Sequence, residues 1–432
     1  NVGSGIAQKS AQEEFEVQMV DREARFVERG QQIISEFLAE AVERRIFRPE
    51  QVEAIQSRIT GVVGTENVAA DTDLVIEAVF EDFDIKTQVF ATLDEVCGEE
   101  TILASNTSSL SVNELAAATG RPDRFVGLHF FFHPAKNRLV EVIPAETTSA
   151  ETLARTVQYC KALGKVVIVC KDRPGFVVNR FFVPWLNEAC LLLEEGVGTT
   201  AQIDAAACKA FRIGMGPFAL MNLTGPPIAL HANDYLAEQL DCPRYTGAQS
   251  LRDLVAAGEM WEINDDLTSE AGAGAGDGTA DGTADGTADG TADGTGDATG
   301  GELGAAETTV ISERLLGQVF AVASQIVAEE ICSMEDVDRG AKVGLRWARG
   351  PFELANQIGI GEAFRMAEAY SKLAGFKLPE FLGKQAESGE PFSFSYVDLE
   401  DEDGIATIRI NRPEAMNALN EQVVSQLGMA LD

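Results

Sequence analysis

Short apolar runs alternate with amphipathic stretches along the first 170 residues of the chain. Runs that are continuously apolar, or apolar at every second position, predict β-strands, whereas amphipathic segments such as residues 85–96 predict helices. The expected strands are residues 15–21, 73–79, 101–104, 125–129, 139–143 and 165–170. This alternation predicts an α/β fold with a doubly wound sheet, which binds ligands at the carboxyl ends of its strands.

The pattern changes near residue 172, where long apolar helices replace the alternation. Residues 177–196 and 199–211 predict two helices. Gly216-Pro217-Phe218 predicts the start of a third, because proline is favoured in the first turn of a helix. We therefore expect a Rossmann-type domain at residues 1–172 and a separate all-helical domain at residues 173–264.

Residues 265–307 are rich in glycine and acids and contain almost no large apolar side chains. A tetrapeptide Asp-Gly-Thr-Ala repeats from Asp277 onwards. Such a segment cannot bury a core, so its composition predicts a disordered, flexible linker.

The helical domain recurs after this linker. The matching landmarks, each pair 134 residues apart, are Arg180 with Arg314, Asp204 with Asp338, and Gly216-Pro217-Phe218 with Gly350-Pro351-Phe352. We expect residues 308–391 to be a second, degenerate copy that packs against the first and stands in for a dimer partner. Asn179 corresponds to Glu313, so a ligand contact made by Asn179 would be lost in the second copy.

Residues 394–432 predict the beginning of another domain. A β-hairpin is expected at residues 396–399 and 404–410, followed by Asn411-Arg412-Pro413 and a helix from about Asn420. We expect this domain to be truncated where the chain stops.

The chain carries 69 acidic and 34 basic residues, a net charge of -35. Such acidity argues against nucleic acid as a partner, because phosphates would be repelled. It is also typical of proteins adapted to high salt. We find no apolar run that we expect to span a bilayer. The seven cysteines lack metal-binding spacing and predict reduced, mostly buried thiols in a cytoplasmic protein.

The richest candidate chemistry lies between Ser105 and Glu141. A cluster of hydroxyl side chains follows one expected strand, His129 ends another, and Glu141 lies within the next. A hydroxyl group, an imidazole and a carboxylate are the groups that general-base catalysis needs. The alternative is that His129 is a core residue with satisfied hydrogen bonds.

Helix, strand and terminal acid at residues 3–21 match the second half of a dinucleotide-binding βαβ unit. Gly3 fits the third glycine of the motif, where helix and strand approach closely, and Asp21 fits the acid that holds the ribose 2′-hydroxyl. Asp21 favours NAD over NADP. The first strand and the earlier glycines would precede residue 1.

Together these segments resemble the (3S)-3-hydroxyacyl-CoA dehydrogenase family over residues 1–264, with the helical part repeated at 308–391. The motifs that carry the resemblance are Gly3-x-Gly5-Ile6-Ala7, Asp21, Ser105-Asn106-Thr107-Ser108-Ser109, Leu128-His129-Phe130-Phe131, Leu139-Val140-Glu141-Val142, Pro174-Gly175-Phe176-x-x-Asn179-Arg180 and Met215-Gly216-Pro217-Phe218. The tail resembles the start of an enoyl-CoA hydratase (crotonase) domain. The whole resembles a fused dehydrogenase–hydratase of fatty-acid β-oxidation, and its acidity suggests a haloarchaeal source.

The resemblance implies an NAD-dependent enzyme acting on an acyl-CoA thioester. It assigns His129 as the catalytic base, Glu141 as the carboxylate that orients it, and Ser108 and Asn179 as contacts to the substrate oxygen. It involves no metal ion.

The cofactor contacts implied by the resemblance are Asn106, on the nicotinamide side, together with Glu81 and Lys86. One departure from the family is that Phe132-His133-Pro134 replaces the usual Asn-Pro, so we expect His133 or Asn137 to replace the missing contact. A homo-oligomer is compatible with the resemblance.

Two other interpretations are compatible with the sequence. The fold could serve as a non-catalytic scaffold, in which the paired helical domains act in assembly. Alternatively, the chain could be a dehydrogenase of a small hydroxy acid on a related fold.

We predict that the 432-residue polypeptide alone does not bind NAD, because the first strand and the phosphate loop would precede Asn1. Restoring that upstream segment should restore binding, as titration calorimetry would show. Tight binding of NAD to the chain as given would contradict the assignment of Gly3.

Overall fold

A computed structural model describes residues 2–263, 304–402 and 404–431. The linker expected at residues 265–307 lies outside the described residues up to position 303. From Ala305 onwards the chain is already helical, so the second helical copy begins slightly earlier than expected.

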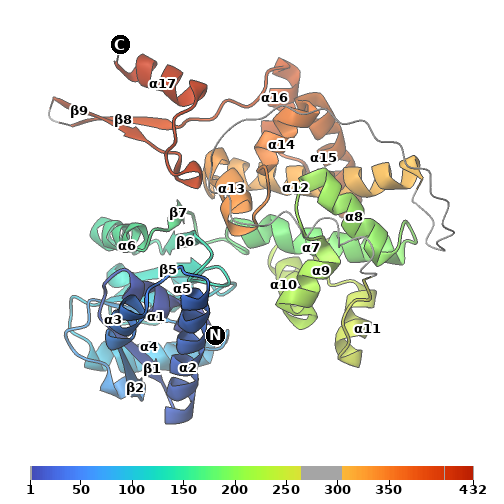
Figure 1. Ribbon diagram of the computed structural model, residues 1–432. Coiled ribbons are helices and arrows are strands. Elements are labelled where there is room, and N and C mark those ends of the chain that lie inside the picture. The colour runs from blue at the N-terminus through green and yellow to red at the C-terminus, as the bar shows by residue number, and fades with distance from the viewer. Residues whose placement is uncertain (1, 264–303, 403, 432) are drawn as a thin grey trace.

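The N-terminal part is an α/β domain with parallel strands, as the alternating pattern predicts (Figure 1). Its strands are β1 (Val17–Asp21), β2 (Ile59–Val63), β3 (Leu74–Glu77), β4 (Ile102–Ser105), β5 (Phe125–Phe130), β6 (Leu139–Pro144) and β7 (Val166–Val169). Its helices are α1 (Val2–Gln12), α2 (Ala24–Glu43), α3 (Pro49–Ser57), α4 (Phe83–Val96), α5 (Val112–Ala117) and α6 (Ala150–Ala162). Helices α2 and α3 lie where the sequence of residues 23–57 predicts helices, whereas strand β2 and helices α5 and α6 were not expected.

The strands form two sheets rather than a single one. Strands β1 and β2 pair with each other in parallel, and a five-stranded sheet has the order β3-β4-β5-β6-β7. All its pairs are parallel except β5 with β6, which is antiparallel. The connection between these two strands, residues 131–138, is too short for a crossover, so the strands must run in opposite directions.

Two helical copies follow. The first contains α7 (Val178–Glu194), α8 (Thr200–Phe211), α9 (Pro217–Thr224), α10 (Pro226–Gln239) and α11 (Gln249–Ala257). The second contains α12 (Ala305–Ala328), α13 (Met334–Arg339), a π-helix at Gly340–Gly344 termed η6, α14 (Pro351–Ile358), α15 (Ile360–Ala374) and α16 (Glu380–Ser388). The tail forms hairpin β8 (Val397–Glu402) and β9 (Ile405–Ile410), then α17 (Glu421–Leu431).

The repeated Gly-Pro-Phe motif has a structural cause. Asp204 accepts hydrogen bonds from the first backbone N–H groups of α9, including that of Phe218 at 2.8 Å. Asp338 does the same for α14. A Cβ atom on Gly216 would lie 2.4 Å from the Asp204 carboxyl carbon, so only glycine leaves room for this buried cap.

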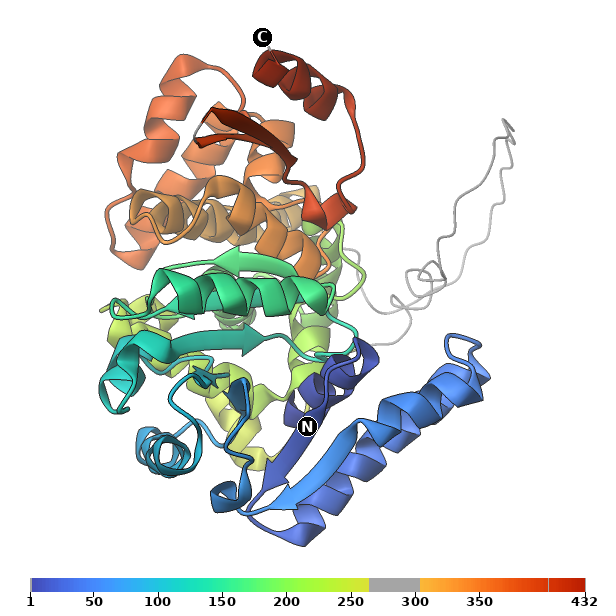
Figure 2. The same cartoon turned by 90° about the vertical axis from the view of Figure 1, so that its left-hand side faces the viewer.

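The two copies pack directly against each other. Trp185 of the first copy and Trp347 of the second contact each other with tilted rings, 5.7 Å apart between ring centroids, inside one continuous apolar core. In two views at right angles, the second copy (orange) also lies next to strands β6 and β7 (Figures 1 and 2).

Helix α12 corrects one expectation about membranes. Within the described residues it is the one helix whose length and apolar character would suffice to cross a bilayer. However, 67% of its apolar window is buried inside the protein, against helices α7, α8 and α15. Its hydrophobicity is therefore explained by its position in the core between the two copies.

Candidate active site

The central feature of the site is a buried pair formed by His129 and Glu141. These residues lie directly opposite each other in the antiparallel register of β5 and β6. Cross-strand neighbours point to the same face of a sheet. Accordingly, His129 Nδ1 lies 2.7 Å from Glu141 Oε2, with both side chains buried.

The second carboxylate oxygen of Glu141 binds the helical domain. Glu141 Oε1 accepts hydrogen bonds from the backbone N–H of Val178 at 2.9 Å and of Val177 at 3.3 Å, at the start of α7. A helix N-terminus stabilises a negative charge, because its first N–H groups lack partners within the helix. A carboxylate with no exposed surface is thus held between an imidazole and a helix end.

Aromatic rings surround the imidazole. The rings of Phe131 and Phe176 lie 4.6 Å and 5.8 Å from the His129 ring, measured between centroids. These rings limit the access of water to the pair, which strengthens its electrostatic interaction.

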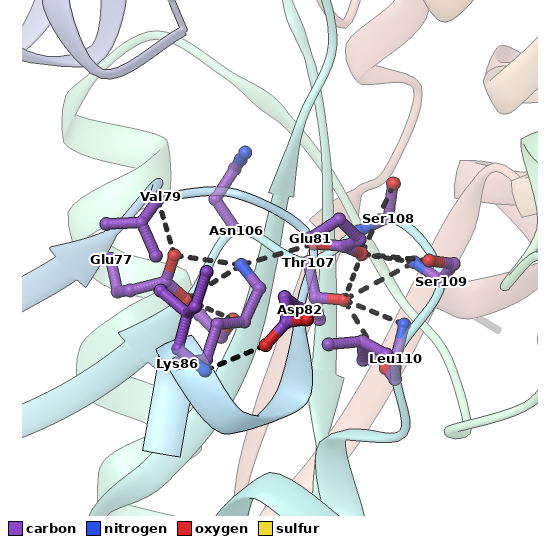
Figure 3. A network of polar contacts seen from close by, with 12 residues as sticks. Glu77, Val79, Glu81, Asp82, Lys86, Asn106, Thr107, Ser108, Ser109 and Leu110 are labelled. Atoms are coloured by element: carbon purple, nitrogen blue, oxygen red, sulfur yellow. Dashed lines mark hydrogen bonds and ion pairs between the residues drawn. The ribbon is translucent and has the colours of Figure 1, made fainter. Parts of the chain in front are cut away.

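A second polar cluster lies at the carboxyl ends of β3 and β4 (Figure 3). Glu81 Oε1 accepts hydrogen bonds from Thr107 Oγ1 at 2.6 Å and from the backbone N–H of Ser108 and Ser109 at 2.7 and 2.9 Å. The other oxygen, Oε2, lies 3.2 Å from Lys86 Nζ. Glu81 therefore orders the segment that carries Ser108.

Burial raises the pKa of Glu81, but the charge of Lys86 and the hydrogen bonds from Thr107 and Ser108 outweigh it and lower the pKa to about 2. Glu81 is consequently ionised across the physiological range.

Lys86 is only 1% exposed and is neutralised within the protein. Its Nζ contacts both oxygens of Glu77, at 2.8 and 3.0 Å, in addition to Glu81. Glu77 also accepts a hydrogen bond from Ser105 Oγ. The structure thus places Lys86 beneath the site, where it supports Glu81. Glu77 was not singled out from the sequence, although an acid inside an apolar strand was a signal.

A cleft with a volume of about 330 Å³ separates the α/β domain from the first helical copy. Glu81, Ser108 and Ser109 line one side of it, and Asn179 lines the other. Two of the predicted catalytic residues, Ser108 and Asn179, are therefore brought together from distant parts of the sequence. His129 is not among the residues that line this cleft.

Two polar lining residues, His231 and Tyr235 of α10, were not predicted from the sequence. Tyr235 donates its hydroxyl hydrogen to the carbonyl oxygen of Ser109, which joins the two walls. No local motif marks either residue, because only the packing of α10 against the α/β domain brings them to the cleft.

The predicted cofactor contacts lie along the strand ends. Asn106 follows β4, and its Oδ1 accepts a hydrogen bond from the N–H of Phe130 at 2.9 Å. Asp21 ends β1 and is exposed. An exposed carboxylate at this position suits a hydroxyl-bearing ribose, so the residues present fit NAD.

The tight glycine contact expected at Gly3 is found at Gly5 instead. A Cβ atom added to Gly3 would lie 3.7 Å from Ala78 Cβ, an ordinary distance among the described residues. A Cβ atom on Gly5 would lie 2.9 Å from Pro134 Cδ, which is too close. The close approach therefore involves α1 and the loop after β5.

Neither candidate for the missing loop contact lines the cleft. The His133 ring packs against Phe37 of α2 at 4.4 Å, and burial together with Lys136 and Lys165 lowers the pKa of His133. Asn137 Nδ2 donates to the carbonyl oxygen of Gly344 at 3.0 Å, so Asn137 ties the loop to the second helical copy.

Two family models match the chain. The 3-hydroxyacyl-CoA dehydrogenase NAD binding domain matches residues 1–173, and the 3-hydroxyacyl-CoA dehydrogenase C-terminal domain matches residues 175–266 and 310–390.

Individual relatives agree with these models. Hydroxyacyl-coenzyme A dehydrogenase, mitochondrial, of Sus scrofa is 40% identical over 229 residues, which cover 52% of this chain and 73% of the relative. The 3-hydroxybutyryl-CoA dehydrogenase of Clostridioides difficile is 35% identical over 60% of this chain and 92% of its own length. The crystal structure of 3-hydroxybutyryl-CoA dehydrogenase from Escherichia coli K12 has a TM-score of 0.73 and 24% identity over 90% of this chain and 96% of its own, and supports the fold alone.

The chain therefore belongs to the 3-hydroxyacyl-CoA dehydrogenase family, and its N-terminal domain is the NAD-binding domain of that family.

The ionisation of Glu81 predicts how stability depends on pH. Because the folded pKa, about 2, lies below the ordinary value of 4.5, ionised Glu81 stabilises the fold above pH 4.5 and this contribution is lost as the pH falls toward 2. Urea denaturation should show a steeper loss of stability in acid for the native chain than for Glu81→Gln, by roughly 2 kcal/mol. Glu95→Gln, on the exposed face of α4, serves as the control. Equal slopes for native and Glu81→Gln chains would contradict the prediction.

Proposed function

We propose that this protein oxidises the 3-hydroxyl group of (3S)-3-hydroxyacyl-CoA thioesters to a 3-oxo group, with NAD⁺ as the oxidant. The observation that carries the proposal is the buried pair of His129 and Glu141, 2.7 Å apart. An imidazole can abstract a proton from a hydroxyl group through one ring nitrogen while a carboxylate holds the other ring nitrogen, and His129 with Glu141 has this arrangement.

We assign the proton transfer to one nitrogen atom of His129. Nδ1 of His129 contacts Glu141, so Nε2 is the ring nitrogen left to accept the proton of the substrate hydroxyl. The imidazolium that forms lies beside the Glu141 carboxylate, which stabilises it. Because α7 already holds this carboxylate through backbone N–H groups, it need not move during the reaction.

Ser108 and Asn179 line opposite walls of the cleft, one from each domain. We assign them to the reacting oxygen, where a hydroxyl and an amide can both donate hydrogen bonds as a carbonyl forms. Glu81 supports this role indirectly, because it fixes the backbone of Ser108.

When bound, NAD⁺ accepts the hydride from C3 of the substrate. The residues we assign to hold it are Asp21 for the ribose, Asn106 for the nicotinamide side and the ionised Glu81 near the cleft. Lys86 forms ion pairs with Glu77 and Glu81 and so compensates part of their negative charge. The products are 3-oxoacyl-CoA, NADH and one proton.

We further infer a role in fatty-acid β-oxidation in the cytoplasm, with residues 394–432 as the beginning of an enoyl-CoA hydratase domain. The hairpin β8–β9 and helix α17 support this assignment of the tail. Hydration of a 2-enoyl-CoA followed by reduction of NAD⁺ by the same gene product would support the assignment of the tail. Fractionation of the source cells would test the cytoplasmic location. The large negative charge fits a haloarchaeal cytoplasm, and a homo-oligomer is compatible with the paired copies.

Replacement of the base tests the mechanism. His129→Gln, made in the full-length gene product, should lower kcat by roughly 10²–10⁴-fold with little change in KM, because it removes proton transfer and not binding. Oxidation of NADH with acetoacetyl-CoA measures this.

The matched control is His133→Gln, which changes a histidine that packs against Phe37 away from the cleft and should retain most of the activity. A native enzyme without turnover would favour a scaffold role, and equal activity on free hydroxy acids would favour the other dehydrogenase class. Full activity in His129→Gln would refute the assignment of the base.

A further inference from the structure

The two helical copies are joined by a reciprocal pair of ion pairs. Arg180 of the first copy contacts Glu329 of the second at 2.6 Å, and Arg314 of the second contacts Glu195 of the first. Each residue lies 134 positions from its counterpart, so the two ion pairs are equivalent under the pseudo-twofold relation between the copies.

The two arginines differ in their further partners. Glu188 gives Arg314 a second carboxylate, with its Oε1 2.6 Å from Arg314 Nε. The residue 134 positions after Glu188 is Val322, which has no polar group. By the same relation Val322 faces Arg180, so Arg180 lacks the second carboxylate that its counterpart has.

The consequence is a buried guanidinium group with unused donors. The Arg180 side chain is 4% exposed, and its Nε and Nη1 atoms have no hydrogen-bond acceptor among the described residues. Donors buried without a partner cost free energy, and this cost is larger for charged groups. An acceptor from outside the chain would remove it.

Arg180 also lines a cavity of about 460 Å³ between the two copies. Polar walls come from residues on both sides, including Arg244, Gln325 and Glu329. Apolar walls are provided by Leu240, Leu373, Ala374 and Phe376. This cavity shares no lining residue with the cleft of Ser108 and Asn179, so it is a separate site.

We propose that this cavity binds a small organic carboxylate through Arg180. A carboxylate is the group that occupies the equivalent position at Arg314, and it forms charge-assisted hydrogen bonds with guanidinium donors. The apolar walls accommodate a short hydrocarbon part of the ligand, and the volume lies in the range of small-molecule sites. The proposal is independent of the dehydrogenase activity.

The position of the site connects it to the active site. Arg180 directly follows Asn179, and both lie in the first turns of α7, whose N-terminus holds Glu141. A ligand on Arg180 therefore contacts the helix that presents the substrate-facing amide.

Titration calorimetry with succinate on the full chain tests the proposal. The native chain should bind succinate saturably, and Gln325→Glu should weaken binding at least about tenfold, because it adds a negative charge to the cavity wall without changing the side-chain size. Val322→Glu should have the same effect by giving Arg180 an internal carboxylate. Val310→Glu is the matched control, since it makes the same change on an exposed part of α12 and should leave binding unchanged.

Each outcome is decisive. Binding that is lost in both cavity variants and kept in Val310→Glu supports the proposal. Gln325 is partly exposed, so Gln325→Glu should fold and keeps the test valid even if Val322→Glu does not fold. Absence of saturable binding to the native chain, equal binding to Gln325→Glu, or tighter binding of inorganic phosphate than of succinate would overturn it.

Discussion

The geometry of the site depends on how the charge of Glu141 is accommodated. A carboxylate with no exposed surface is stable only if its oxygens are fully hydrogen-bonded, and here one oxygen contacts His129 while the other contacts the first N–H groups of α7. The same side chain therefore holds the His129 ring and joins the α/β domain to the helical domain. Any shift of α7 relative to β6 would alter both contacts together.

The second helical copy packs against the segments that hold Glu141. A Cβ atom on Gly340 would lie 2.7 Å from a methyl group of Val178, and one on Gly344 would lie 2.5 Å from a methyl group of Leu139. Val178 donates to Glu141, and Leu139 begins the strand that carries it. The π-helix η6 therefore packs through its two glycines against the two segments that position the carboxylate, which gives the second copy a structural role in the site.

The two helical copies differ at the positions that line the cleft in the first copy. In the first copy Asn179 and His231 line the cleft, whereas their counterparts 134 residues later, Glu313 and Arg365, form an ion pair at 2.8 Å. The capping aspartates and the Gly-Pro-Phe turns are kept in both. The contacts that shape the fold therefore recur in both copies, whereas the cleft-lining residues Asn179 and His231 are not repeated in the second.

The sequence by itself determined the strand–helix alternation, the repeated helical domain and the association of His129 with Glu141. These features depend on local periodicity, on a constant spacing and on a short connection between adjacent strands, all of which can be read along the chain. It did not reveal β2, the division of the strands into two sheets or the buried position of Lys86, because these depend on which surfaces meet. Only the tertiary structure brought Tyr235 and His231 to the cleft and left Arg180 without its second carboxylate. Packing between distant helices decides such contacts, and no pattern within one segment records it.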